Sequence, residues 1–335
     1  MTQANLLSPP TQIPPQTALA LSQKAPLVLS HPPTSSLPWP LSLLFSRETP
    51  EAWTIHENLF YAALRTGDES SALSILTRLE SRFGATNERI ITLRGIYNEA
   101  IATSDADLDK VFDGYEKILR DDPTNMSIRK RRVAVLKALR RPQDALAALT
   151  TLLHNSPTDA EAWAEASELY AGQQAWGQAI FCAEEVLLIT PNAWSAHAHV
   201  ATLHYLSTAS NAPPSLSALA LALKHFCRAV ELNESYLRGY YGLKLVSARL
   251  IKALGDAPPP ASGSSRRIAQ QQQQDEDDVP IPSIETVRRL EEIATAKLAE
   301  IVRQYKSGNK GWQGYDAAEV IAARELLDRD DNTER

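Results

Sequence analysis

The apolar residues near the C-terminus recur at a spacing that is typical of an amphipathic helix. From residue 284 onward they follow one another every three to five positions, and a last helical stretch covers residues 315–327. A helix with this pattern packs one face on a core and leaves the other face in water. We expect closing helices at 284–328 and a disordered tail at 329–335. The apolar positions of the first stretch are Ile284, Val287, Leu290, Ile293, Leu298, Ile301 and Val302.

Prolines mark the segments that interrupt this helical pattern. Ten of the 21 prolines lie within residues 1–50, and three stand together at 258–260, ahead of five glutamines and a run of acidic residues. Proline lacks an amide donor and resists helix formation, and such polar stretches bury too little apolar surface to fold. We expect a largely disordered Pro-rich segment at 1–45, with one short docking helix at 17–30, and a disordered loop at 255–283.

Three prolines of the central region set a constant period. Pro123, Pro157 and Pro191 are each 34 residues apart, which is the length of a tetratricopeptide (TPR) repeat, a helix-turn-helix unit. In this frame the second helix of each unit needs a small residue where two helices approach closely. The residues at that position are Ala145, Ala179 and, after an insertion, Ala222. Large apolar or aromatic residues fit the frame at Leu149, Trp163, Tyr170 and Phe226.

The frame extends in both directions with defects and gives at least five helix pairs between residues 50 and 254. One pair is too small to bury its own apolar face, so neighbouring pairs must stack. We therefore predict an all-α fold over 46–254, a TPR-type α-solenoid in which antiparallel helix pairs form a right-handed superhelix. The alternative is an ordinary helical bundle in which the proline spacing is accidental.

Composition and charge narrow the range of partners. Hydrophobic residues make up 44% of the chain and charged residues 22%, which suffices for a soluble core. A net charge of -6 argues against bulk electrostatic capture of nucleic acid. Apolar runs stay short of the roughly 20 residues that cross a bilayer, and the N-terminus lacks the pattern of a secretory signal. Two cysteines, Cys182 and Cys227, lie in alanine-rich helical segments, so we expect buried thiols in a reducing, cytosolic environment.

Candidate catalytic chemistry is sparse. The sequence contains neither a Gly-rich phosphate loop nor a Gly-x-Ser-x-Gly elbow, and it has only 13 glycines. Four histidines, His197, His199, His204 and His225, lie near the cysteines in sequence. His197 and His199 are two positions apart and point away from each other on a helix, whereas metal ligands on one helix usually sit three or four apart. We expect no enzyme activity, no cofactor and no bound metal; the alternative is a metal-dependent activity at these residues.

A basic run, Arg129-Lys130-Arg131-Arg132, opens the first helix of one repeat and is the strongest charge feature. One interpretation is a docking patch for an acidic partner segment or for lipid headgroups. The alternative is a solvated helix face whose long side chains cover apolar neighbours. A nuclear-localisation signal is disfavoured because the run lies inside a packed repeat.

Four stretches of this region resemble one known family. They are residues 115–125 (YEKILRDDPTN), 129–132 (RKRR), 161–170 (EAWAEASELY) and 179–185 (AIFCAEE). Together they look like the TPR subunit of the ER membrane protein complex, subunit 2, and the resemblance covers roughly residues 50–250. The Pro-rich N-terminus and the 255–283 segment depart from the family pattern.

The resemblance implies a soluble, non-catalytic scaffold on the cytosolic face of the endoplasmic reticulum membrane, attached peripherally through protein partners. It would bind cytosolic segments of the membrane-embedded subunits, including the insertase-type subunit, and a second cytosolic subunit. The whole assembly inserts tail-anchored and multipass membrane proteins.

The first helices of a TPR array line its concave side, and we expect partner binding there. Mixed charge and tyrosine suit an extended polar segment. The alternative function is a co-chaperone that binds the acidic C-terminus of a heat-shock chaperone, although Glu161 and Glu168 interrupt the basic clamp which that function needs. The predicted partner-binding residues are Lys130, Lys137, Glu161, Glu168, Tyr205, Arg238 and Tyr241.

Overall fold

The computed structural model describes residues 7, 15–30, 50–209, 215–255, 280–308, 312 and 314–333. Within these residues the regular secondary structure is helical and contains no strand. The helices form two compact units, Met1–Asn155 (unit 1) and Ser156–Arg335 (unit 2). The sequence predicted one array over 46–254, and the structure divides that range at residue 155. A solenoid permits such a division because each repeat contacts only its neighbours.

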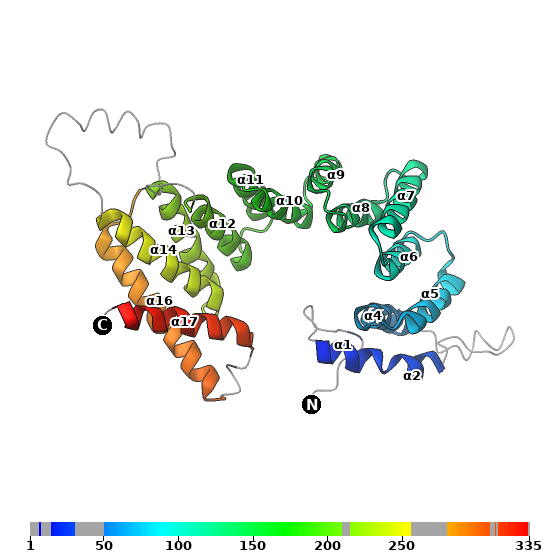
Figure 1. Cartoon of the computed structure of the whole chain (residues 1–335), viewed down its shortest axis with the longest axis horizontal. Helices are drawn as coiled ribbons and strands as arrows, with labels where there is room; N and C mark the ends of the chain where they lie inside the picture. Colours follow the sequence, from blue (N-terminus) through cyan, green and yellow to red (C-terminus); the bar gives the residue numbers. More distant parts are fainter. Residues whose placement is uncertain are drawn as a thin grey trace. The chain divides into compact units, whose positions relative to one another are not determined.

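Unit 1 begins with two short helices that pack on the first repeat (Figure 1). The sequence predicted one helix at 17–30, but the chain turns at Gln23 and Lys24 and restarts with Pro26 in the first helical turn, where proline is tolerated. Ala25 is fully buried, and Arg78 Nη2 donates to the Leu29 carbonyl at 2.7 Å. The helices of unit 1 are α1 (Pro15–Ser22), α2 (Ala25–Ser30), α4 (Pro50–Thr66), α5 (Glu69–Phe83), α6 (Glu88–Ile101), α7 (Asp105–Asp121), α8 (Met126–Ala138) and α9 (Pro142–Asn155).

Unit 2 contains two further helix pairs, one more first helix and the two closing helices (Figure 1). Helix α16 packs along α14, and α17 contacts both. The apolar stripe that begins at Ile284 is the contact face of α16, with Val287, Leu298 and Ile301 fully buried. The helices of unit 2 are α10 (Ala160–Gly172), α11 (Trp176–Ile189), α12 (Trp194–Ser207), α13 (Leu216–Leu232), α14 (Leu237–Gly255), α16 (Ile284–Lys306) and α17 (Ala317–Thr333).

The repeat frame is confirmed by burial. Ala145, Ala179 and Ala222 are each 0% exposed, as the close approach of two helices requires. The turn between first and second helix also repeats, because Arg140 and Gln174, 34 positions apart, both adopt left-handed backbone with φ of 56° and 58°. Pairs α4/α5, α6/α7 and α8/α9 in unit 1 and α10/α11 and α12/α13 in unit 2 make up the predicted five.

Polar residues at the helix starts explain where the helices begin. An Asn, Asp or Ser side chain at the N-cap accepts a hydrogen bond from a backbone amide that has no partner inside the helix. Residues that do so are Asp68, Asn87, Ser104, Asn125, Asp159, Ser215 and Ser283.

The ends of the predicted disordered segments differ from the expectation where the structure describes them. Helix α17 runs to Thr333, so residues 329–333 belong to a helix and not to the predicted disordered tail, because the periodic pattern alone gives no stop signal there. Residues 334 and 335 lie outside the described residues. The same holds for 1–6, 8–14 and 31–49 of the Pro-rich segment and for 256–279 of the predicted loop.

Candidate partner-binding surface

The basic run in α8 is held by contacts inside unit 1. Arg131 pairs with Glu99 on α6 through two nitrogens, one of them Nε at 2.9 Å. Arg132 pairs with Glu116 on α7 and lies over the Phe112 ring. The arginines thus bridge the second and third repeats, an outcome that neither interpretation of the run anticipated.

Arg129, at the start of the same run, also has an intramolecular acceptor, since its Nε donates to the Pro123 carbonyl at 2.8 Å. Arg129, Arg131 and Arg132 are therefore engaged by the protein's own carboxylates and backbone.

Glu99 also accepts a hydrogen bond from the buried Tyr115 hydroxyl of α7. Burial and the neighbouring carboxylate raise the pKa of Tyr115 well above its usual value. Gly95 on α6 makes room for this ring, because a Cβ there would lie 2.3 Å from the Tyr115 hydroxyl oxygen. Glycine at this position therefore permits the contact between α6 and α7.

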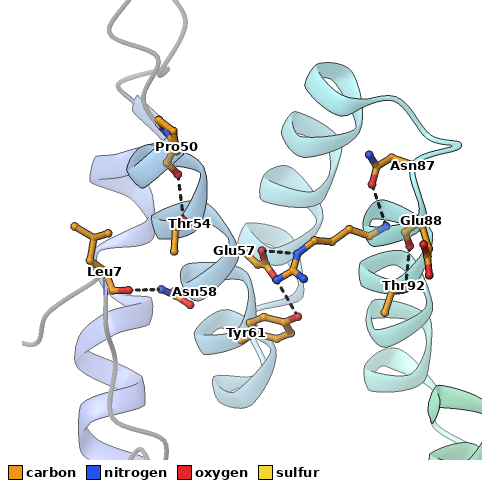
Figure 2. Close-up of polar contacts among 10 residues, drawn as sticks. Leu7, Pro50, Thr54, Glu57, Asn58, Tyr61, Asn87, Glu88 and Thr92 are labelled. Carbon is orange, nitrogen blue, oxygen red and sulfur yellow. Dashed lines mark hydrogen bonds and ion pairs between the residues drawn. The ribbon is translucent and has the colours of Figure 1, made fainter. Parts of the chain in front are cut away.

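A second carboxylate-arginine pair links α4 to α6 in the same way (Figure 2). Arg89 donates from Nε to Glu57 Oε2 at 3.0 Å, and the Tyr61 hydroxyl donates to Glu57 Oε1 at 3.3 Å. Burial, followed by the Glu57 charge, raises the pKa of Tyr61 to about 12. We call this set, Glu57, Tyr61, Arg89, Glu99 and Arg131, the charged wall of unit 1.

A cleft of about 650 Å³ lies between α6 and α7. Gly95 and Gly114 lie on its two sides, and Ile91, Val111 and Ile118 add apolar surface. The repeat frame did not indicate this cleft. The signal available in the sequence was the pair of glycines inside two helical stretches.

Unit 2 holds a pocket of about 500 Å³ between α12, α13 and α14, which we call the unit 2 pocket. Three of the predicted partner-binding residues, Tyr205, Arg238 and Tyr241, line it. Gly242 allows the Phe226 ring to form part of the lining, because a Cβ at residue 242 would lie 2.2 Å from that ring. The remaining lining residues are Ser195, Ala198, His199, Thr202, Leu206, Tyr236 and Leu245.

The other predicted residues are distributed over both units. Lys130 is half-buried and Lys137 exposed on α8 in unit 1, whereas Glu161 and Glu168 are exposed on α10 in unit 2. Glu168 acts electrostatically on His199, a residue of the pocket, although burial outweighs it and lowers the pKa of His199. Glu168 therefore belongs to the surroundings of the pocket, and Glu161 is not a lining residue.

The histidines take separate roles. His199 Nε2 lies 3.1 Å from the Ser167 hydroxyl, which donates to the Ala179 carbonyl, so the imidazole is the donor. His197 Nδ1 lies 3.1 Å from His225 Nδ1 across the α12/α13 pair, a contact that the sequence analysis missed because the two residues are 28 positions apart. Among the residues that the structure describes, no three His, Cys, Asp or Glu side chains are arranged to hold a metal ion.

Burial also shifts the pKa values of the two thiols and of one histidine in unit 2. It raises the pKa of both Cys182 and Cys227 to about 11, which disfavours the reactive thiolate. Burial, with His197 and His204 close by, lowers the pKa of His225 to about 4. In the described part of the chain, no helix combines the length and apolar character that a membrane span requires.

These stacked helix pairs define a TPR-type all-α solenoid protein. A family model described as the EMC2 TPR-like repeat domain matches residues 94–221. The TPR repeat protein oca3 of Schizosaccharomyces pombe is 33% identical over 202 residues, covering 60% of this chain and 68% of that protein. The chain belongs to the ER membrane protein complex subunit 2 family.

Further relatives agree with this family. ER membrane protein complex subunit 2-A of Xenopus laevis is 33% identical over 200 residues, covering 60% of this chain and 64% of its own length, slightly less than two thirds. Among solved structures, a tetratricopeptide repeat protein from Parabacteroides merdae is 17% identical, with coverage of 82% of this chain and 97% of that chain. Its TM-score is 0.41, and nothing about function follows from it.

Proposed function

We propose that the chain is a non-catalytic scaffold subunit of the ER membrane protein complex and binds cytosolic segments of the membrane subunits along its first helices. In this role it supports the insertion of tail-anchored and multipass membrane proteins. The observation that carries the proposal is the unit 2 pocket, in which tyrosines and an arginine from first helices surround an apolar floor. Aromatic residues and arginine supply most of the binding energy at protein interfaces.

The chemistry of the pocket suits a peptide segment better than a reacting small molecule. Its volume of about 500 Å³ is within the usual range for ligand pockets, and its lining is mainly apolar with a few polar groups. Tyrosine hydroxyls can hydrogen-bond the main chain of an extended segment while the rings contact its side chains.

The expected partners follow from the family. Relatives carry the name ER membrane protein complex subunit 2, and we propose that this chain likewise associates with membrane-embedded subunits, the insertase-type subunit among them, and with a second cytosolic subunit. It would then sit peripherally on the cytosolic face of the endoplasmic reticulum membrane.

Affinity purification from detergent-solubilised membranes tests the proposal. The tagged wild-type chain should recover membrane-embedded subunits of the complex, and recovery of a heat-shock chaperone in their place would favour the co-chaperone alternative. Thr202→Trp places a large ring in the pocket and should reduce this recovery severalfold. Thr202 is exposed and its hydroxyl donates to the carbonyl four residues earlier, so the fold should tolerate the change.

Thr77→Trp is the matched control, because Thr77 on α5 is also exposed and its hydroxyl also donates to the carbonyl four residues earlier. Equal recovery by both variants would remove the pocket from the binding surface. Lys130→Glu with Lys137→Glu, tested alongside, asks whether α8 contributes: reduced recovery with unchanged helicity places the partner there as well, and unchanged recovery excludes these lysines.

A further inference from the structure

Arg238 gives the unit 2 pocket a definite electrostatic character. Among the described residues that line the pocket, it alone carries a permanent charge. Burial lowers the pKa of His199, the other ionisable basic lining residue, so that its neutral form is favoured. Arg249 adds positive charge nearby, since its guanidinium lies 5.2 Å from the Tyr205 ring centroid. The lining itself therefore presents a positive charge, while Glu168, which acts on His199, adds negative charge to its surroundings.

Glu319 of α17 supplies the anion that Arg238 now binds. Both Arg238 Nε and Nη2 donate to the same oxygen, Glu319 Oε1, at 2.7 and 2.6 Å. The Arg238 side chain nevertheless remains 66% exposed, so a second carboxylate can approach it from solvent. The Tyr315 hydroxyl donates to the Ser235 carbonyl at 2.9 Å. This hydrogen bond joins the segment before α17 to the turn before α14.

The interior of the pocket complements an apolar side chain. The Phe226 ring is only 4% exposed and packs against Gly242, so that it forms part of the pocket floor, and Tyr205, Tyr241 and Leu245 extend this apolar surface. An apolar floor next to one paired arginine matches a ligand that presents a large apolar side chain beside a carboxylate.

We propose that the unit 2 pocket binds an extended partner segment in which a large apolar residue is followed by an acidic one. The apolar side chain enters against Phe226, and the acidic side chain takes the place of Glu319 on Arg238. Glu319 is thus an intramolecular competitor that lowers affinity. The inference rests on the proposed function, because it specifies which segments the first helices of unit 2 recognise.

Labelled Gly/Ser peptides with a central Phe-Glu, Phe-Lys, Phe-Gln or Ala-Glu pair test this with the full chain, by fluorescence anisotropy. Phe-Glu should bind about three- to fivefold more tightly than Phe-Lys or Phe-Gln, the range expected of one partly exposed ion pair. Ala-Glu should bind still more weakly, because it leaves the apolar floor unfilled. Equal binding of all four peptides, or no binding, overturns the proposal.

Two variants separate the contribution of charge to peptide binding from any effect on the fold. Arg238→Gln should abolish the preference for Phe-Glu over Phe-Gln while retaining the preference for Phe over Ala. Glu319→Gln should strengthen Phe-Glu binding about threefold and leave Phe-Gln unchanged. Glu285→Gln is the control, since Glu285 forms an exposed ion pair with Arg289 at the start of α16. Loss of Phe-Glu binding in Glu319→Gln contradicts the competitor role.

The purification test keeps this inference distinct from the proposed function. If Thr202→Trp loses the membrane subunits while the four peptides bind alike, the scaffold function stands and the sequence preference is wrong. If Phe-Glu is selected but membrane subunits are not recovered by the wild-type chain, the pocket recognises such segments in a different assembly.

Discussion

The two units use the same helix pairs but present different first-helix surfaces. In unit 1, the charged wall joins α4, α6 and α8 through Glu57 to Arg89 and Glu99 to Arg131, and the members of each pair are 32 positions apart. In unit 2, the corresponding helices α12 and α14 border an apolar pocket with one arginine. The comparison teaches that a dense basic run in a repeat protein can stabilise the stacking of repeats, whereas a single arginine beside an apolar pocket forms the surface that we propose for binding.

Removing Glu99 should produce the largest loss of stability, because its side chain is 13% exposed and its carboxylate accepts from both Arg131 and Tyr115. Glu99→Ala leaves a guanidinium and a buried hydroxyl without an acceptor, at a cost of about 2–4 kcal/mol. Urea unfolding followed by circular dichroism measures the change. Glu285→Ala, in an exposed pair, should cost less than about 1 kcal/mol. Equal costs would show that the charged wall contributes no more than a surface pair.

The two close-packed glycines should respond unequally to alanine. At Gly95, the new methyl group meets Tyr115, which its hydrogen bond to Glu99 holds in place, so we expect a loss of about 2–3 kcal/mol. At Gly242, Phe226 can move into the adjoining pocket, so the loss should be about 1 kcal/mol or less, with weakened binding of Phe-containing peptides.

Gly114→Ala provides the control for both changes, because a Cβ there meets no atom within 4 Å. The higher helix propensity of alanine should raise the free energy of unfolding by about 0.5–1 kcal/mol. A larger loss at Gly242 than at Gly95 would contradict the assignment of the fixed and the mobile ring.

Acidification should weaken unit 2 through His225. Its pKa is lowered to about 4 in the folded chain, whereas an unfolded histidine titrates near 6.5, so between these values the unfolded state binds the extra proton. The contribution is complete above about pH 6.5 and is lost as the pH falls toward about 4. Allowing for solvent screening, we expect a loss on the order of 1–2 kcal/mol.

Unfolding curves of the wild-type chain and of His225→Gln, recorded between about pH 4 and about pH 6.5, check this predicted loss of stability. The difference in stability between the two proteins should decline with acidification. A constant difference would show that His225 has the same pKa in both states.

The smallest predicted change in stability should be equal in the two units. Arg140 in unit 1 and Gln174 in unit 2 hold left-handed backbone in equivalent turns, at a cost that glycine avoids. Arg140→Gly and Gln174→Gly should each raise the free energy of unfolding by about 0.5–1 kcal/mol. A slight rise in the midpoint of thermal unfolding measures this gain. A gain in one unit only would mean that the two turns are not equivalent in energy.

The sequence by itself determined the architecture. The period of Pro123, Pro157 and Pro191 and the alanines in its register defined the helix pairs, since close helix packing restricts side-chain size at fixed positions. Three pocket residues, Tyr205, Arg238 and Tyr241, could also be selected, because the register identifies which positions belong to first helices.

Only the tertiary structure decided which charges are paired within the chain. Arg131 and Arg132 looked available in the sequence, but their acceptors Glu99 and Glu116 lie on two other helices, and no local pattern records that pairing. The pairing of Arg238 with Glu319, 81 positions away, and the contact between His197 and His225 are of the same kind. Register along one helix is local and repeats with a period, whereas the partner of a long charged side chain depends on how separate helices meet in space.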